Sequence, residues 1–290
     1  MTRTAEQPAK AHARLRRIEG RHNALVKTLR QAFAHAERTE EGDCAIEGVR
    51  IVEEAIRSGL RFRAVFFKES AQNVVEKLLP QIGAHAETLL LPDRLFDAVV
   101  PSETPQGVAA LVRWKEFSLD DMSERLQVGP MIIVVGVQDP GNLGTTIRSA
   151  EAFGSAGVVT GEGTVSVFNS KVVRASAGSM FRLPIVAAKS AGGVESVLGQ
   201  LRGQGVRLMA TSSHKGMPID QANLSGSCAV LIGSEGSGLP RGLMAHVDEM
   251  IAIPQSAPVE SLNAGVAASV VLYEAARQRR GSTGTAMSIG

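Results

Sequence analysis

The stretch "MIIVVGVQDPGNLGTTIRSAEAFG" (131–154) joins an apolar run to a predicted helix through a polar turn. The run at 131–137 predicts a buried strand. Arg148 follows the turn, six residues past Asn142. A turn that only joins a strand to a helix does not need so many residues with particular conformational or capping preferences, so we interpret this turn as a candidate functional loop. Its special residues are Asp139, Pro140, Gly141, Asn142 and Gly144.

Ordinary structural roles also account for this turn. Asn142 is of a type that caps helix N-termini. Arg148 stands three residues before Glu151, a spacing at which opposite charges pair on a helix. From the sequence, both alternatives stay open.

Apolar runs recur after the turn, with helix-like segments between them. Runs such as "MIIVV" and "CAVLI" are apolar throughout, which is typical of parallel strands covered on both faces. The strand candidates are 131–137, 157–160, 183–187, 206–210, 229–232 and 250–253. A last long helix is expected from near Leu262, with an apolar stripe at helical spacing. The stripe consists of Leu262, Val266, Ser269, Val270 and Tyr273.

The residues before the turn predict a second, smaller α/β unit. A helix is expected over 14–36, with Ile18, Leu25 and Leu29 as its apolar positions. The strand candidates after it are 44–48, 63–68, 87–91 and 107–114, with helices near 49–58, 72–79 and 94–99. We therefore divide the chain into a domain at 10–114, a polar linker at 115–130, a domain at 131–280 and a disordered tail at 281–290.

Composition argues against several classes of protein. The two cysteines, Cys44 and Cys228, lie far apart without a CxxC, and no HExxH occurs, so neither a disulfide framework nor a metal site is expected. No run approaches the roughly 18 apolar residues of a membrane span, and no apolar N-terminal run predicts a signal peptide. With 44% hydrophobic residues and a net charge of +2, the chain is expected to be soluble and cytoplasmic, without membrane contact.

Basic residues gather in two places. Between Lys10 and Arg30 only one acid, Glu19, accompanies a basic run that suits a phosphate-facing surface. A solvated helix face is the ordinary alternative for this run. Its members are Lys10, Arg14, Arg16, Arg17, Arg21, Lys27 and Arg30. The stretch "NSKVVRASAGSMFRLP" (169–184) also holds three basic residues and no acid, which suits a nucleic acid backbone. A plain surface loop is its alternative.

Two more loops follow strand candidates, and ligands of open parallel sheets gather beyond the carboxyl ends of strands. In "IGSEGSGLP" (232–240), three glycines surround Glu235, in an order that matches neither the dinucleotide fingerprint nor a P-loop. A tight turn with an exposed glutamate is the alternative. In "IPQSAPVESLNAG" (253–265), Ser261 is a candidate cap of the last helix, with Asn263 in its first turn. A capped helix start without further function is the alternative there.

Together, the order and spacing of these motifs resemble the SpoU (TrmH-like) RNA ribose 2'-O-methyltransferases of the SPOUT superfamily. The resemblance covers 131–277, with all three family motifs in the family order. "IEGVRIVEEAIRSG" (46–59) resembles, more loosely, the family's substrate-binding module, which is similar to a small RNA-binding ribosomal protein. The motif residues are Asn142, Gly144, Arg148, Phe153, Gly154, Lys171, Arg174, Ser176, Gly178, Gly233, Glu235, Gly238, Ile253, Pro254, Ser261, Leu262 and Asn263.

The resemblance implies a fold, a cofactor and an assembly. The fold is α/β, with a C-terminal parallel-sheet SPOUT domain that forms a trefoil knot and a smaller N-terminal α/β RNA-binding domain. The cofactor is S-adenosylmethionine, without a metal. Family members are homodimers with the site at the knot interface, so Arg148 is expected to act across it. The cofactor-binding residues by motif match are Gly233, Ile253, Leu262 and Thr211, where glycine at 233 allows the backbone to approach the cofactor closely.

The resemblance also implies transfer of a methyl group to a ribose 2'-hydroxyl. The turn is expected to hold Asn142 and Arg148 on one helix start, facing the methyl donor. A guanidinium stays protonated in proteins, so we expect Arg148 to bind the adjacent phosphate or to stabilise the developing alkoxide. The catalytic residues by motif match are Arg148, Asn142, Glu235, Ser261 and Asn263. The residues expected to bind the RNA backbone are Lys171, Arg174, Arg21 and Arg17.

Ribosomal RNA is the preferred substrate, because a dedicated leading domain accompanies the knot. The alternatives are a transfer RNA ribose 2'-O-methyltransferase, a knotted protein that binds RNA without methylating it, and a base methyltransferase on the same knot. A generic nucleotide-dependent α/β enzyme is disfavoured, since the phosphate-loop and dinucleotide motifs are missing.

Overall fold

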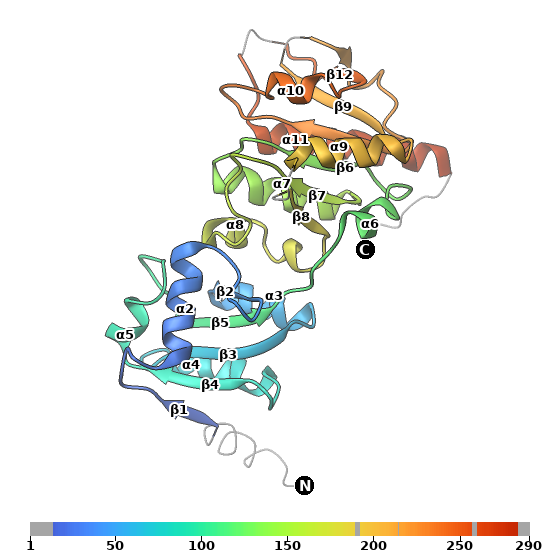
Figure 1. Cartoon of the computed structure of the whole chain (residues 1–290). Coiled ribbons are helices and arrows are strands. Elements are labelled where there is room, and N and C mark those ends of the chain that lie inside the picture. Colours follow the sequence, from blue (N-terminus) through green and yellow to red (C-terminus); the bar gives the residue numbers. More distant parts are fainter. Residues whose placement is uncertain (1–13, 189–191, 214, 257–259, 284–290) are drawn as a thin grey trace. The chain divides into compact units, whose positions relative to one another are not determined.

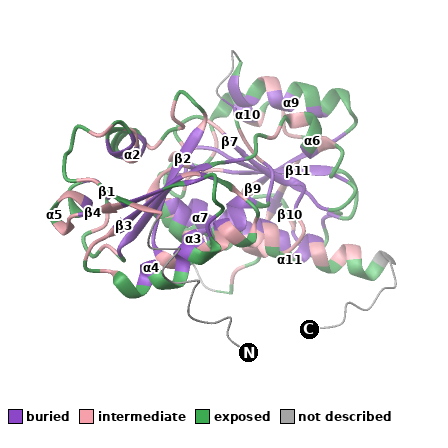
Figure 2. Ribbon diagram, turned by 90° about the horizontal axis from the view of Figure 1, so that it is seen from below, coloured by how far each residue is buried: buried purple, intermediate pink, exposed green. Residues whose placement is uncertain are grey.

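The structure, a computed structural model, describes residues 14–188, 192–213, 215–256 and 260–283. It divides into two compact units (Figure 1). The first unit comprises Met1–Lys115 and Ser166–Phe181, and the second comprises Glu116–Val165 and Arg182–Gly290. Strands predicted from the sequence are confirmed in both units, and Figure 2 shows them as largely buried.

The first unit is built on a five-stranded mixed sheet. Its strands are β1 (Leu15–Arg17), β2 (Asp43–Glu47), β3 (Arg61–Lys68), β4 (Glu87–Leu91) and β5 (Val108–Arg113). They follow the order β1-β4-β3-β5-β2, in which β1, β4 and β3 are parallel and β5 is antiparallel to both of its neighbours.

Helices cover both faces of this sheet (Figure 1). On one face, helices α2 (Ala24–His35) and α5 (Asp93–Asp97) contribute Leu29 and Phe96 to a core shared with the strands. Helices α3 (Val49–Arg57) and α4 (Gln72–Leu78), followed by a 3-10 turn at Leu79–Gln81, bury their apolar residues on the other face.

The helix expected over 14–36 is wrong in its first part. Leu15–Arg17 instead forms β1, which pairs with β4, and the Arg16 guanidinium lies 2.7 Å from the Glu87 carboxylate. Helix α2 begins only at Ala24, because the Asn23 side chain accepts hydrogen bonds from the amides of Leu25 and Val26 and so fixes the helix start there. Lys10 of the basic run lies outside the described residues.

Residues 166–181, which the sequence-based boundaries assign to the second domain, belong to the first unit. This segment contains helix α8 (Ser170–Ala175) and a 3-10 turn at Ser179–Phe181. Aromatic side chains fix it: the Trp114 ring meets Phe168 and Phe181 edge-on at 5.3 and 5.6 Å. The Arg38 guanidinium also lies 5.3 Å from the centre of the Phe168 ring.

The second unit is built on a seven-stranded sheet in which every pair is parallel. Its strands are β6 (Met131–Val134), β7 (Gly157–Thr160), β8 (Ile185–Ala187), β9 (Arg207–Ser212), β10 (Met217–Pro218), β11 (Cys228–Ile232) and β12 (Glu249–Ala252). They follow the order β10-β12-β9-β11-β6-β7-β8. The parallel sheet expected from the continuous apolar runs is therefore present.

Helices α7 (Pro140–Ala152) and α11 (Ala264–Thr283) pack against each other on one face of this sheet. Helices α6 (Leu119–Ser123), α9 (Gly193–Gly203) and α10 (Arg241–Met244) share an apolar core on the other face. Met122 of α6 is fully buried in that core. Residues 116–130, expected to be a linker, are thus an integral part of the second unit.

The apolar stripe expected on the last helix is confirmed only in part as one surface: Leu262 precedes α11, and Ser269 forms a hydrogen bond with Ser149 of α7. Val266 and Tyr273 lie on the outer side and are 46% and 51% exposed, while other small and aliphatic residues make the buried side. These buried residues are Ala264, Ala268, Val271, Leu272 and Ala275. Helix α11 runs to Thr283, into the part expected to be a disordered tail, and residues 284–290 lie outside the described residues.

Cys44 and Cys228 are buried free thiols. Among the residues that the structure describes, no helix is long and apolar enough to cross a membrane. The same residues contain no cluster of three metal-ligating side chains.

Glu47, at the end of β2, is a buried carboxylate that is only 4% exposed. Its Oε2 atom has no hydrogen-bond partner among the described residues, and Arg174 of α8 lies 3.9 Å away. Burial raises the pKa of the Glu47 carboxyl, while hydrogen bonding by Ser102 and the charge of Arg174 oppose that rise. Ionisation of this carboxyl group therefore lowers the free energy of unfolding.

We expect Glu47→Gln to raise the melting temperature at neutral pH, and the gain to vanish under acid conditions. Below about pH 4.5, the ordinary pKa of glutamate, residue 47 is protonated in folded and unfolded chains alike. As the pH rises through the raised pKa of the folded state, the folded wild type loses its proton and part of its free energy of unfolding. Thermal unfolding across this pH range, with the exposed Glu40→Gln as control, measures the effect. A lower melting temperature for Glu47→Gln at neutral pH would show that the attraction of Arg174 dominates.

Candidate active site

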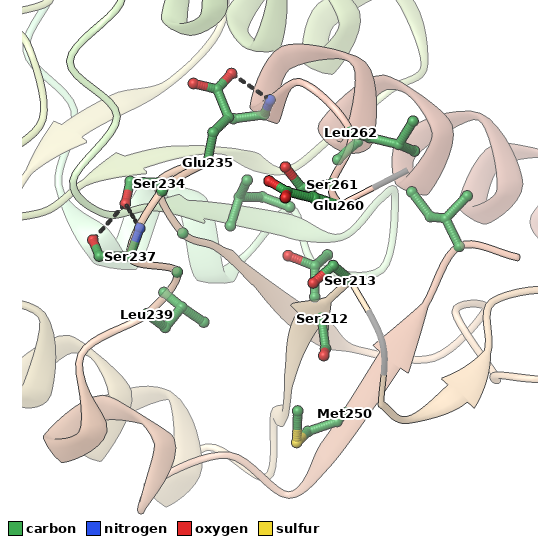
Figure 3. Close-up of a pocket in the computed structure, with 18 of the residues that line it drawn as sticks. Ser212, Ser213, Ser234, Glu235, Ser237, Leu239, Met250, Glu260, Ser261 and Leu262 are labelled. Carbon is green, nitrogen blue, oxygen red and sulfur yellow. Dashed lines mark hydrogen bonds between the residues drawn. The ribbon is translucent and has the colours of Figure 1, made fainter. Parts of the chain in front are cut away.

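A cavity of about 560 Å³ opens at the carboxyl ends of β9, β11 and β12 (Figure 3). These three strands are neighbours in the parallel sheet, so the loops that follow them meet at one edge. Helix α11 closes one side through Ala264 and Ala267. The volume lies in the range of small-molecule and cofactor sites.

The loop after β11 forms one wall and folds back on itself. The backbones of Ser234 and Gly238 exchange hydrogen bonds of 3.0 and 3.3 Å, and the hydroxyls of Ser234 and Ser237 lie 2.8 Å apart. A Cβ atom on Gly233 would lie 2.5 Å from the carbonyl carbon of Gly238. Glycine at 233 is therefore required by the loop itself, a reason that differs from the close cofactor approach inferred from the sequence.

Three polar side chains from distant parts of the chain form one hydrogen-bonded network. Asn142 Nδ2 donates to Glu235 Oε1 at 2.6 Å, and Asn263 Nδ2 donates to Asn142 Oδ1 at 2.7 Å. The amide of Ala264, the first residue of α11, also donates to Glu235 Oε1 at 2.9 Å. The network ties the turn after β6, the loop after β11 and the start of α11 together.

The caps of the two helices differ from the sequence-based alternatives. Asp139, not Asn142, caps α7 and accepts from the Asn142 amide at 3.0 Å. Asn263, not Ser261, serves the start of α11, since its Oδ1 accepts from the Val266 amide at 3.1 Å. Because Asp139 caps α7, the Asn142 side chain does not serve as the cap and can join the network. Asn142 is only 8% exposed there.

Close packing of α7 on α11 brings the network residues within reach of each other. A Cβ atom on Gly265 would lie 3.1 Å from the carbonyl oxygen of Asn142, so the helices approach closely at this point. One helical turn further along, the hydroxyls of Ser149 and Ser269 share a hydrogen bond of 2.7 Å.

All four residues expected to bind the cofactor line the cavity: Gly233, Ile253, Leu262 and Thr211. Of the five expected catalytic residues, Glu235 and Ser261 line it as well. Asn142 and Asn263 lie directly behind Glu235 in the network. Sequence reasoning missed further lining residues, namely Ser212, Ser213, Met250, Gln255 and Glu260. The polar pair Ser212 and Ser213, at the end of strand β9, was a sequence signal for the first two of these.

Arg148 does not belong to this cavity within one chain. It is exposed on α7 and is not among the described residues that line the cavity. Six residues along a helix amount to a rotation of about 240° and a rise of about 9 Å from Asn142. The expectation that both residues face the donor from one helix start is therefore wrong for a single chain. The pairing of Arg148 with Glu151 is not found, because Glu151 accepts from Arg182 at 2.5 Å.

The four residues expected to bind RNA all lie in the first unit. Arg174 donates to the Ser102 hydroxyl at 3.2 Å, and the guanidinium of Arg17 lies 2.6 Å from the carboxylate of Glu69. Lys171 and Arg21 are exposed to solvent. Arg174 and Arg17 are thus held in place by neighbours, and Lys171 and Arg21 are open to a partner.

We expect Asn142→Ala to lower the free energy of unfolding by about 1–3 kcal/mol, because it removes two side-chain hydrogen bonds, one to Glu235 and one from Asn263, each of which contributes about 0.5–1.5 kcal/mol. Urea denaturation measures this loss. Thr145→Ala, at an exposed position of the same helix, is the matched control. Equal stability of the two variants would show that the network contributes nothing to the fold.

Comparison with known proteins agrees with this geometry. The SpoU rRNA Methylase family model matches residues 129–273, and the MRM3-like substrate binding domain model matches residues 23–110. The chain is 32% identical over 260 residues to the 23S rRNA (guanosine(2553)-2'-O)-methyltransferase RlmP of Bacillus subtilis, a match that covers 89% of this chain and 98% of that protein.

Two further matches come from Streptomyces viridochromogenes. The 23S rRNA (uridine(2479)-2'-O)-methyltransferase is 31% identical over 249 residues, covering 83% of this chain and 85% of that protein. The crystal structure of the SpoU methyltransferase AviRb in complex with AdoMet matches with a TM-score of 0.75 and 28% identity, covering 89% of this chain and 100% of that one. With a family model across half its length and a 32% identical relative covered over 98% of its length, this chain belongs to the SpoU rRNA methylase family.

Proposed function

We propose that this protein transfers a methyl group from S-adenosylmethionine to a ribose 2'-hydroxyl of ribosomal RNA. The observation that carries the proposal is the meeting of three loops at one cavity, with Glu235 bonded to Asn142 and to the start of α11. Two relatives named as 23S rRNA 2'-O-methyltransferases support the substrate class. Because one is named for a guanosine and the other for a uridine, the base next to the methylated ribose stays open.

The cavity fits S-adenosylmethionine by its chemistry. The cofactor carries a positive sulfonium and a positive ammonium, and the carboxylates of Glu235 and Glu260 line the cavity. Apolar walls for the purine come from Met250, Ile253 and Leu262. The trefoil knot expected from the family resemblance is part of this proposal, since it is the arrangement that would hold the three loops together.

When bound, the cofactor supplies an electrophilic methyl group whose bond to sulfur breaks as the bond to the ribose oxygen forms. Rate then depends on holding the 2'-oxygen in line with that bond. We assign this task to the network of Asn142, Glu235 and Asn263 with Ser261 beside it. Arg148 stabilises the charge that develops on the ribose oxygen or binds the adjacent phosphate, since a guanidinium does not accept the proton.

The first unit is the proposed RNA-binding module, as its match to a substrate binding domain supports. Lys171, Arg174, Arg21 and Arg17 lie there and supply positive charge for the RNA backbone. A ribosomal RNA substrate also supports a cytoplasmic location, which is part of this proposal. Methylation of transfer RNA, and RNA binding without methylation, remain the alternatives that the assay below separates.

We expect Arg148→Ala to lower the rate of methyl transfer about 100-fold or more, because one charge-stabilising donor is lost. Its affinity for S-adenosylhomocysteine should stay within about 2-fold of the wild type, since Arg148 lies outside the cavity. Transfer of labelled methyl to ribosomal and transfer RNA, nucleoside digestion of the product and calorimetry provide the readouts. Arg125→Ala, at another exposed arginine of the second unit, is the control.

Each outcome of this assay is informative. Combined loss of cofactor affinity and folding in Arg148→Ala would assign that residue a structural role. Absence of methyl transfer by the wild type, with RNA binding intact, would favour the non-catalytic alternative. Methylated transfer RNA or a methylated base would overturn the proposed substrate or the proposed target atom.

We also propose that the second unit forms a homodimer through the outer side of α11. Val266 and Tyr273 are large apolar residues, roughly half exposed, on the helix that carries Asn263 at its start. The Tyr273 ring meets Phe153, the residue directly after α7, edge-on at 5.7 Å, which extends the apolar surface to the end of the second helix. Exposed apolar surface of this kind marks a site of protein association.

Val266→Asp is expected to weaken the dimer at least about 10-fold, because it would place an unpaired charge in the interface. Light scattering across a concentration series gives the dissociation constant. Val128→Asp is the matched control, since Val128 is 58% exposed in the same unit but far from α11 in sequence. A wild type that is monomeric at all concentrations, or equal effects of both variants, would refute this interface.

A further inference from the structure

The Glu151 carboxylate stands next to Arg148 on α7 but is bound to a different arginine. Arg148 and Glu151 are the only ionisable side chains between residues 144 and 152, and they are three residues apart. At this spacing two side chains are neighbours on the helix surface, with Cβ atoms about 5–6 Å apart, and opposite charges pair. Glu151 instead binds Arg182, whose Nε and Nη2 atoms donate to its two carboxylate oxygens at 2.5 and 2.9 Å.

The geometry explains why Glu151 binds Arg182 and not Arg148. Two parallel hydrogen bonds between a guanidinium and a carboxylate form the strongest arrangement of such a pair. The side chains of Arg182 and Glu151 are 40% and 30% exposed, so water screens their attraction only in part. A pair of neighbours on an exposed helix surface, by contrast, shifts an equilibrium only about 2-fold. Arg148 is exposed and has no hydrogen bond or ion pair with another described residue.

Without Arg182, the charge of Glu151 would act on Arg148 and on its proposed target. The carboxylate would attract the Arg148 guanidinium, and it would also repel an RNA phosphate or an oxygen on which negative charge develops. At about 6 Å, one unit charge in water changes an equilibrium about 3-fold, and the effect grows where solvent is excluded. By neutralising Glu151, Arg182 removes both effects.

We propose that Arg182 is a positioning residue for methyl transfer: it occupies Glu151, so that Arg148 meets the RNA as an unpaired guanidinium. This inference rests on the role proposed for Arg148. It gives a function to a residue that is not among the described residues lining the cavity.

The first test measures how accessible the Arg148 guanidinium is, without RNA or cofactor. Phenylglyoxal modifies arginine side chains, and a guanidinium paired with a carboxylate reacts more slowly. Mass spectrometry of the digested full-length protein gives the rate at each arginine, with the exposed Arg125 as internal reference. In Arg182→Ala, modification of Arg148 is expected to slow about 2-fold, the effect of one surface pair. In the double variant Arg182→Ala/Glu151→Gln, the rate should return to that of the wild type.

The second test measures methyl transfer to ribosomal RNA by the same variants. Arg182→Ala should lower kcat/KM at least about 3-fold, and the double variant should recover to within about 2-fold of the wild type. A merely structural role of the ion pair predicts the opposite, because the double variant lacks the pair as well. Arg182→Lys, which keeps a positive charge beside Glu151, should stay closer to the wild type than Arg182→Ala does.

The control is Arg202→Ala, which breaks an exposed ion pair of 2.8 Å with Asp248 in the same unit and should leave both readouts unchanged. Unchanged modification of Arg148 in Arg182→Ala, or a double variant as slow as Arg182→Ala, would overturn the assignment. If modification follows the expected pattern but the wild type transfers no methyl group, Arg182 does keep Glu151 from Arg148. Its role in methyl transfer is then refuted together with the proposed function.

Discussion

The arrangement of the candidate site depends on one carboxylate oxygen. Glu235 Oε1 accepts both from the Asn142 side chain and from the backbone at the start of α11. Glu235 is exposed at the cavity, and its two hydrogen bonds connect it to the starts of both helices that supply the donors. The cavity wall formed by the loop after β11 keeps its position because Glu235 belongs to both the wall and the network.

The strand order explains why such a connection is needed. Strands β11 and β6 are neighbours, so Glu235 and Asn142 follow adjacent strands. Strand β12, however, is separated from β6 by β9 and β11. Asn263 reaches Asn142 only because α11 crosses back onto α7, and glycine at 265 permits their close approach. The site is therefore a product of helix packing as much as of the sheet edge.

The sequence predicts those parts of the structure that local patterns determine. Continuous apolar runs identify the strands, and polar residues after them identify the cavity edge. The outward direction of Val266 and Tyr273 was not predictable, because apolar residues at helical spacing look alike whether they meet a core or a partner. The buried side of α11 consists largely of alanines. Alanine contributes little to a hydrophobic pattern in the sequence, but its small side chain allows helices to approach closely. Likewise, the strand at Leu15–Arg17 is set by pairing with distant residues and by ion pairs, and neither leaves a local pattern.

The exposure of Arg148 connects the catalytic role proposed for this residue to the proposed homodimer. A guanidinium surrounded by water stabilises a developing charge only weakly, because the solvent screens it. To contribute what methyl transfer requires, Arg148 must lose part of its hydration when the substrate is bound. Within one chain nothing described covers it, and the helix it stands on packs against α11, whose outer side is apolar. If the proposed second copy covers this side, it would also remove water near Arg148, and the proposed dimer would then account for both the apolar surface and the exposed arginine.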